Sequence, residues 1–108
     1  MELQPKYRLW LETEDGYVLG KGSFELLQGI PEKGTLRGAA KSLGMSYRHA
    51  WGIIKQIEKH IGKSLLDTYR GGKSGGGAKL TRIGYELLET YSNLIKAFDS
   101  ICVNWKEK

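Results

Sequence analysis

The chain has 108 residues, 40% of them hydrophobic and 27% charged, with a formal net charge of +5. This length suits one domain around one modest core and leaves no room for a second domain with its own pocket. Its apolar runs are far shorter than the roughly 20 residues that span a bilayer, and no export signal is recognisable. The single cysteine, Cys102, excludes an internal disulfide. We therefore expect a single-domain, cytoplasmic protein with no membrane partner.

The positive charge is concentrated in the middle of the chain. Residues 33–82 carry eleven basic and two acidic side chains, a net charge of +9, whereas the segments before and after them carry −3 and −1. Such a concentration favours a surface that binds a polyanion, and ordinary solvated charges are the alternative. The eleven basic residues are Lys33, Arg37, Lys41, Arg48, Lys55, Lys59, Lys63, Arg70, Lys73, Lys79 and Arg82.

A short antiparallel hairpin is predicted over residues 1–22. Residues 7–12 alternate between an apolar and a more polar face, which is typical of a strand. Asp15-Gly16 then favours a two-residue turn, so that residues 17–21 return as the second strand.

A helix is expected to follow the hairpin. Ser23 is a good N-cap, and Phe24, Leu27 and Ile30 recur after it at helical spacing. Pro31 is predicted to end this helix after about two turns, because proline has no backbone N–H to donate.

Two further helices form a predicted helix-turn-helix. The first begins after the N-cap Thr35 and ends at Gly44, and the second begins after the N-cap Ser46 and ends at Gly62. A short first helix joined to a longer second one through Gly-Met-Ser is typical of this motif. The buried stripes are expected to be Leu36, Ala39, Ala40 and Leu43 in the first helix, and Ala50, Ile54, Ile57 and Ile61 in the second.

A wing is predicted directly after the helix-turn-helix. Residues 64–70 and 78–80 read as two strands, and residues 71–77 between them contain five glycines. This tip is either a plain loop or a phosphate-contacting loop in which Lys73 and free backbone N–H groups meet the anion. A nucleotide-binding P-loop is excluded, because Asp67 stands where its first glycine belongs.

A long final helix is expected after the N-cap Thr81. Its apolar stripe is wider than one small domain needs to cover, so we predict that two copies pack across a two-fold axis. The interface residues of this homodimer are predicted to be Leu87, Leu88, Tyr91, Leu94, Ile95, Phe98, Ile101, Cys102 and Trp105.

The second helix of the helix-turn-helix has an outer face suited to DNA. Arg48 can bond guanine in a bidentate fashion, and Gly52 would let the helix backbone lie close to the groove wall. Trp51 is either a core anchor or a DNA contact. His49 and His60 lie eleven positions apart on this helix, too far to share a metal ion. We found no catalytic arrangement of side chains, and we expect no enzyme, cofactor or metal site.

At this point the sequence resembles a known family. The Gly-Thr at residues 34–35, Ser-Tyr-Arg-His-Ala-Trp at 46–51, Gly-Gly-Lys-Ser-Gly-Gly-Gly-Ala at 71–78 and Leu-Thr-x-x-Gly at 80–84 closely resemble the N-terminal domain of the ModE family of molybdate-responsive regulators. The resemblance covers about residues 23–100, and the frame also resembles the LysR-type winged helix.

The resemblance implies a homodimer whose two recognition helices enter successive major grooves of a palindromic operator, with double-stranded DNA as the partner. By position it assigns DNA contacts to the start of the second helix and to the wing. Together with the outer face described above, the predicted DNA-binding residues are Thr35, Ser46, Tyr47, Arg48, His49, Trp51, Gly52, Lys55, Arg70, Lys73 and Lys79.

The predicted fold is mainly α with small β content. It comprises an N-terminal hairpin (1–22), a winged helix-turn-helix (23–80) and a C-terminal dimerisation helix (81–108). The molybdate-binding domains of ModE-like regulators have no counterpart in this sequence, so a separate sensor protein is one partner that we consider. Two other functions stay open: a dimeric sensor of molybdate-like or tungstate-like anions, and a winged-helix module that binds RNA or protein.

Overall fold

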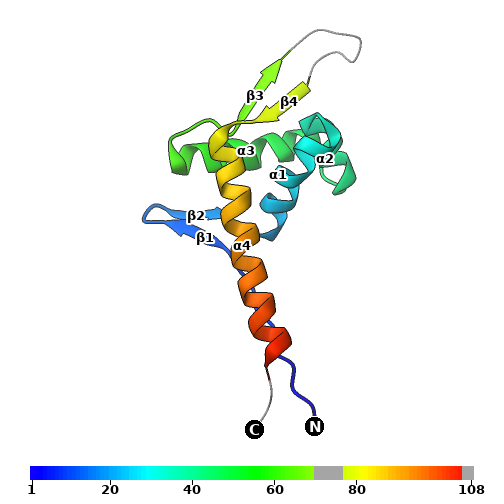
Figure 1. Ribbon diagram of the computed structural model, residues 1–108. Helices are drawn as coiled ribbons and strands as arrows, with labels where there is room; N and C mark the ends of the chain where they lie inside the picture. Colours follow the sequence, from blue (N-terminus) through cyan, green and yellow to red (C-terminus); the bar gives the residue numbers. More distant parts are fainter. Residues whose placement is uncertain (70–76, 106–108) are drawn as a thin grey trace.

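The computed structural model describes residues 1–69 and 77–105. The molecule is elongated, with extents of 60 × 31 × 22 Å. Its elements, shown in Figure 1, are β1 (Leu11–Thr13), β2 (Gly16–Leu19), α1 (Lys21–Lys33), α2 (Leu36–Ser42), α3 (Tyr47–Ile61), β3 (Leu66–Tyr69), β4 (Gly77–Leu80) and α4 (Arg82–Asn104). The predicted mainly α architecture, with two small hairpins and a long C-terminal helix, is confirmed.

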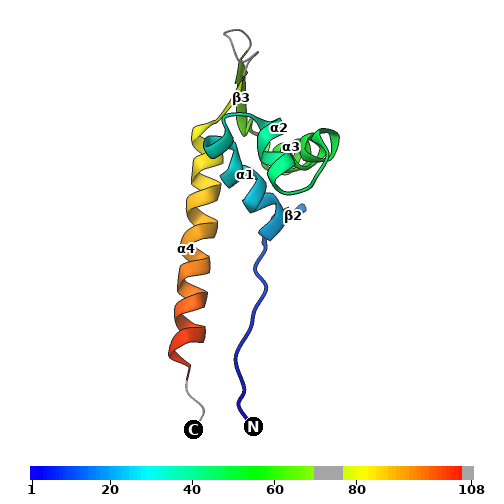
Figure 2. The same cartoon turned by 90° about the vertical axis from the view of Figure 1, so that its right-hand side faces the viewer.

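Helix α1 lies between α3 and α4, so α3 and α4 occupy opposite sides of the molecule (Figure 2). The core consists of fully buried side chains such as Leu26, Leu27 and Ile54. Small residues bring α1 close to α2, because a Cβ at Gly29 would lie 3.2 Å from the Cβ of Ala39. The two helices of the helix-turn-helix, α2 and α3, are therefore held on one side of α1, and α4 is held on the other.

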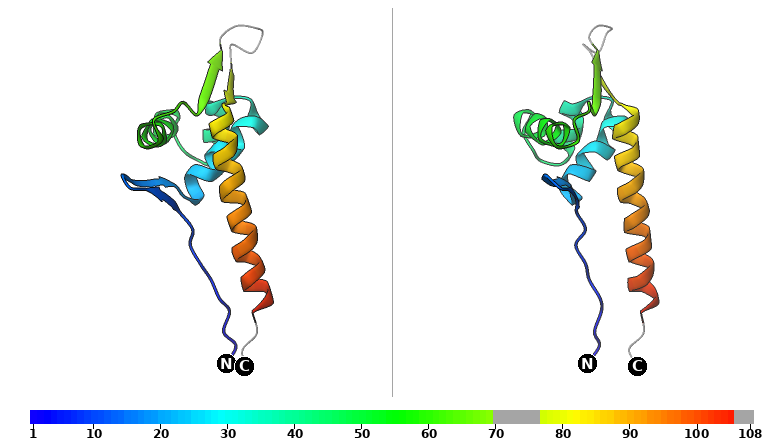
Figure 3. Two further views of the ribbon diagram at one scale, coloured as in Figure 1. Left: turned by 60° about the vertical axis from the view of Figure 1, so that its left-hand side comes forward. Right: turned by 90° about the vertical axis from the view of Figure 1, so that its left-hand side faces the viewer.

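The two hairpins lie on either side of α3 (Figure 3). In the wing, β3 and β4 pair antiparallel from Leu66↔Leu80 to Tyr69↔Gly77, as predicted. In the N-terminal hairpin, the predicted position of the turn, Asp15-Gly16, was wrong by one residue. The turn is at residues 14–15, and Gly16 already pairs with Thr13. Gly16 has φ 119°, a backbone conformation that glycine adopts readily and side chains with a Cβ rarely do.

The start and end of α1 differ from the prediction. Gly20, not Ser23, is the N-cap, and the Gly20 N–H donates to the Ser23 hydroxyl at 2.9 Å. Pro31 lies inside the helix and does not end it. It removes only one donor close to the end, and the last turn still closes because the Gly34 N–H donates to the Ile30 carbonyl at 2.8 Å.

Three predicted N-caps are confirmed. The hydroxyl oxygens of Thr35, Ser46 and Thr81 accept hydrogen bonds from the backbone N–H three residues later, at 2.9, 3.0 and 3.2 Å. The predicted glycine stops are confirmed as well, since Gly44 and Gly62 have φ 69° and 70°. These local signals set the boundaries of α2, α3 and the beginning of α4.

Residues 7–10 are not part of a strand, although the alternating pattern predicted one. They run along α4, and the N-terminus lies at the same end of the molecule as the last turn of α4 (Figure 2). The Tyr91 hydroxyl donates to the Leu9 carbonyl at 2.9 Å, and the Tyr7 ring stacks on Phe98 with centroids 5.2 Å apart. Contacts with α4 thus replace the strand pairing that the pattern suggested.

Candidate nucleic-acid interface

Helix α3 has one buried and one open face. Ala50, Ile54 and Ile57 are at most 2% exposed, as predicted, and Ile61 is half-buried at the end of the helix. The residues on the opposite face are exposed: Arg48, Gly52, Lys55, Gln56 and Lys59. The core therefore fixes which face of α3 is available to a partner.

The predicted contacts Thr35 and Ser46 lie at the first turns of α2 and α3. Each side-chain oxygen is engaged in capping its own helix. A hydroxyl that accepts a hydrogen bond keeps its own proton as a donor. Both residues can therefore cap a helix and donate to a phosphate oxygen at the same time.

Arg48, His49 and Gly52 border a hollow between α3, β2 and the first turn of α1. Its volume is about 630 Å³, and its walls include Val18 and Met45. Arg48 and His49 are exposed. Apart from the adjacent residues and backbone of its own helix, no heavy atom lies within 4 Å of the position that a Cβ on Gly52 would take. The backbone of α3 is therefore open to close approach at this point.

Two aromatic rings form a flank of α3 beside its open face. The rings of Tyr47 and Trp51 meet edge to face, with centroids 6.2 Å apart and an interplanar angle of 87°. Trp51 is half-buried and packs against the core, and the Lys55 ammonium lies 5.2 Å from the centroid of its ring. Trp51 thus anchors α3 and also supports one of the predicted cationic contacts.

The sequence reasoning missed Arg37 as a member of this surface. Arg37 lies on the first turn of α2, and its guanidinium carbon is 4.2 Å from the centroid of the Tyr47 ring. Its place in the basic segment was the only signal in the sequence, since the ring contact depends on how α2 and α3 cross. This contact extends the surface from α3 onto α2.

One acidic residue of the basic segment has a structural role. Glu58 forms an ion pair with Lys55 at 3.3 Å. Its other carboxylate oxygen accepts a hydrogen bond from the Leu65 N–H at 2.7 Å, which ties the end of α3 to the start of the wing. Glu58 therefore offsets part of the Lys55 charge while it holds the wing in place.

The described part of the wing adds one basic side chain, Lys79, to the candidate interface. Lys79 is exposed on β4, opposite Asp67 in the strand register, and its ammonium lies 5.9 Å from the centroid of the Tyr69 ring. Arg70 and Lys73, the other predicted wing contacts, lie outside the described residues. Their roles stay predictions.

The predicted dimer stripe divides into two parts. Up to Ile95 the stripe is largely covered within the protomer: Tyr91 is 2% exposed, and Leu87, Leu88, Leu94 and Ile95 are half-buried. From Phe98 onward it is open, because Phe98, Ile101 and Trp105, the residue after α4, are 38%, 60% and 57% exposed, while Cys102 is half-buried. The sequence did not point to Val103, which is 81% exposed.

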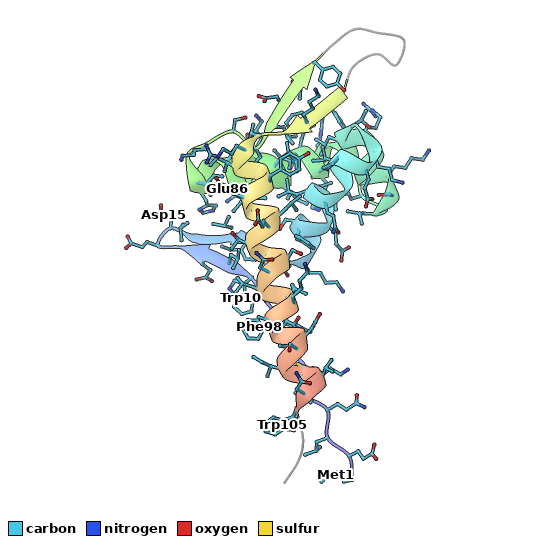
Figure 4. The ribbon with its side chains drawn as sticks, viewed as in Figure 1. Met1, Trp10, Asp15, Glu86, Phe98 and Trp105 are labelled. Carbon is cyan, nitrogen blue, oxygen red and sulfur yellow. The ribbon has the colours of Figure 1, made fainter. Side chains whose placement is uncertain are left out.

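Figure 4 shows Phe98 and Trp105 on the same side of the C-terminal end of α4, with Trp10 near Phe98 in this view. Trp10 is 52% exposed, and its indole N–H donates to the Glu12 carboxylate at 2.8 Å. The open apolar surface is thus built from both ends of the chain.

In residues 1–69 and 77–105, no group of three or more histidine, cysteine or acidic side chains could hold a metal ion. Within the same ranges, no helix is both long and apolar enough to cross a membrane.

The chain is similar to named regulators. It is 34% identical over 101 residues to the DNA-binding transcriptional dual regulator ModE of Escherichia coli strain K12, covering 90% of this chain and 38% of that protein. It is 37% identical over 71 residues to the molybdenum transport protein ModE of Herbaspirillum seropedicae, covering 66% of this chain and 26% of that protein. These matches confirm the resemblance to ModE, and the chain spans less than two fifths of the length of either protein.

The fold is also similar to a solved structure. The crystal structure of the CbnR_DBD–DNA complex matches with a TM-score of 0.57 and 23% identity, covering 73% of this chain and 85% of that one. Residues 22–85 match the family described as bacterial regulatory helix-turn-helix protein, lysR family. That segment runs from the start of α1 through the wing to the start of α4. The chain therefore belongs to the LysR family of bacterial helix-turn-helix regulators.

Proposed function

We propose that this protein is a transcriptional regulator that binds a palindromic operator in double-stranded DNA as a homodimer. The open face of α3 carries the proposal: Arg48, Gly52 and Lys55 stand opposite the buried stripe, within a segment of net charge +9. The family is one of DNA-binding regulators and not of enzymes. Such a regulator acts on the nucleoid, in the cytoplasm.

In this proposal affinity and specificity come from different side chains. Lys55, Lys79 and their basic neighbours neutralise phosphates and release counterions, which makes the affinity strongly dependent on salt. Arg48, on the first turn of α3, reads a guanine through its O6 and N7 atoms. Phosphate contacts thus set the position of the protein, and base contacts set the sequence preference.

The proposed dimer uses the second half of α4. Ile101 and Trp105, four positions apart, are each more than half exposed, although they are large and apolar. Exposed large apolar side chains on one side of a helix are typical of an interaction site. Burial against a second copy would cover it and would place two α3 helices on one duplex. Residues 23–80 would then contact DNA, and residues 81–108 would hold the dimer.

A selection from a random pool of duplex DNA tests this function. We expect enrichment of an inverted repeat whose half-site centres lie about one helical turn, roughly 34 Å, or a multiple of it, apart. A structured RNA in excess should compete no better than unrelated duplex of equal charge. Failure to enrich any sequence would refute sequence-specific binding, and enrichment of isolated half-sites would refute the dimer. Preferential capture by the RNA would favour the interaction module.

A further inference from the structure

Arg37 and Tyr47 form a stacked pair that joins α2 to α3. The two helices lie next to each other in Figure 2, and the Arg37 guanidinium carbon sits 4.2 Å from the centre of the Tyr47 ring. Arg37 is exposed, and Tyr47 is 39% exposed. The guanidinium is therefore held over the first residue of the recognition helix while it still faces solvent.

The ring under Arg37 is itself supported. Tyr47 meets the half-buried Trp51 edge to face, and Trp51 packs against the core. The Tyr47 ring is thus a supported platform and not a freely rotating surface group. A guanidinium stacked on such a platform loses less side-chain entropy when it binds a ligand.

The contact with the Tyr47 ring does not use the N–H donors of Arg37. The guanidinium carbon lies over the ring, and the five N–H donors are spread around the edge of the planar group. Among the described residues the ion pairs involve Lys55 and Arg82, and no carboxylate pairs with Arg37. Its charge and its donors are therefore available to an anion from outside the protein.

The position of Arg37 indicates which anion this is. In a helix-turn-helix the second helix enters the major groove, and the first helix crosses the sugar-phosphate backbone. Arg37 belongs to the first helix and stands at the N-terminal turn of the second. We propose that Arg37 binds a DNA phosphate and that the Tyr47 ring positions it, an inference that rests on the proposed DNA-binding function.

The test compares binding of the selected operator and of an unrelated duplex over a series of salt concentrations. We expect Arg37→Ala to weaken both complexes by a similar factor, about tenfold, and to reduce the salt slope by about 0.9, the value for one lost phosphate contact. Tyr47→Phe keeps the ring and should leave the Arg37 contribution intact. Tyr47→Ala should lose part of it, so the double variant Arg37→Ala/Tyr47→Ala should lose less binding free energy than the sum of the two single losses; strictly additive losses would show that the ring does not position Arg37.

Lys96→Ala is the matched control, because it removes one exposed positive charge from α4, away from the recognition helix. If Arg37→Ala changes the salt slope no more than Lys96→Ala does, the phosphate contact is refuted. A loss confined to the operator would make Arg37 a base contact and would also overturn the proposal. An unchanged slope with a lowered urea midpoint would assign Arg37 a purely structural role. If the wild-type protein binds no duplex at all, the proposed function itself fails, and that result is distinct from these three.

Discussion

The phenol of Tyr7 donates a hydrogen bond to the carboxylate of Asp99 at 2.6 Å, across 92 positions of the chain. The same hydroxyl lies 3.3 Å from the Ile95 carbonyl oxygen, and the ring stacks on Phe98. Residues 1–10 have no strand partner, so these contacts hold the N-terminal segment along the second half of α4. The segment thereby becomes part of the surface that the proposed dimer covers.

Alkaline pH should release this segment. The hydrogen bond to Asp99, followed by burial, raises the pKa of Tyr7 from 10.0 to about 12. Because the folded pKa lies above the ordinary value, the stabilisation is complete below pH 10 and is lost as the pH rises through about 12. NMR of the tyrosine ring carbons should show one late titration that Tyr7→Phe removes. Burial also raises the pKa of Tyr91, so Tyr91 should give a second signal that titrates at high pH. Only a high-pH signal that is absent from the Tyr7→Phe spectrum is therefore assigned to Tyr7. If no such signal disappears in the variant, the hydrogen bond is not formed in solution.

Gly52→Ala should stabilise the fold and weaken DNA binding. The new Cβ would meet no atom within 4 Å, and alanine is a better residue for a helix interior, so the free energy of unfolding should rise by roughly 0.5–1 kcal/mol. DNA affinity should fall, because the methyl group would stand between the helix backbone and the groove wall. Urea unfolding and operator titration measure the two effects. Asn93→Ala is the control, since it also puts alanine at an exposed helix position but lies on α4, away from α3; equal effects of both variants on DNA binding would contradict close approach at Gly52.

Arg48→Ala and Lys79→Ala should have different effects on DNA binding. Loss of a bidentate guanine contact should reduce discrimination between operator and unrelated duplex by about 1–3 kcal/mol. Loss of the Lys79 charge should weaken binding to all sequences alike and lower the salt slope by up to about one unit. Titrations against both duplexes at several salt concentrations measure this. An Arg48→Ala variant with unchanged discrimination would mean that α3 reads bases through other side chains.

Ile101→Asp should convert the dimer into monomers. Ile101 is 60% exposed on the open part of α4, and a carboxylate placed there would be buried without a partner in the dimer. Light scattering after gel filtration should show the monomer mass, and the operator should be bound more weakly and without cooperativity. Ser100→Asp adds the same charge at the neighbouring exposed position and should leave the dimer intact. A dimer that survives Ile101→Asp would place the interface elsewhere.

The parts of the fold that were predicted correctly depend on short-range interactions. Thr35, Ser46 and Thr81 cap helices that begin at the next residue, and Gly62 ends α3 in the left-handed region. Each of these caps joins residues within one turn of the chain, so it can be identified from the sequence without knowledge of the tertiary structure. The buried stripe of α3 follows for the same reason, because helical periodicity alone puts its apolar residues on one face.

The candidate site was predicted in part. The exposed face of α3 was identified from its composition, whereas Arg37 was not assigned to the site. Its contact with Tyr47 requires two helices to cross at one angle, and no spacing in the sequence encodes that angle. The division of the α4 stripe was also missed, since Tyr91 is buried by Phe24 and the Leu9 carbonyl, which come from the other end of the chain.

The sequence by itself determined the order of the elements, the boundaries of α2 and α3, and the concentration of positive charge between residues 33 and 82. Hydrogen bonds within one turn and the periodicity of apolar residues are sufficient for these features. The tertiary structure decided the course of residues 7–10 and the platform under Arg37. It also decided which part of α4 stays open. Each of these features depends on contacts between segments that are distant in the sequence. Such contacts form only when the helices have packed, with α3 and α4 on the two sides of α1.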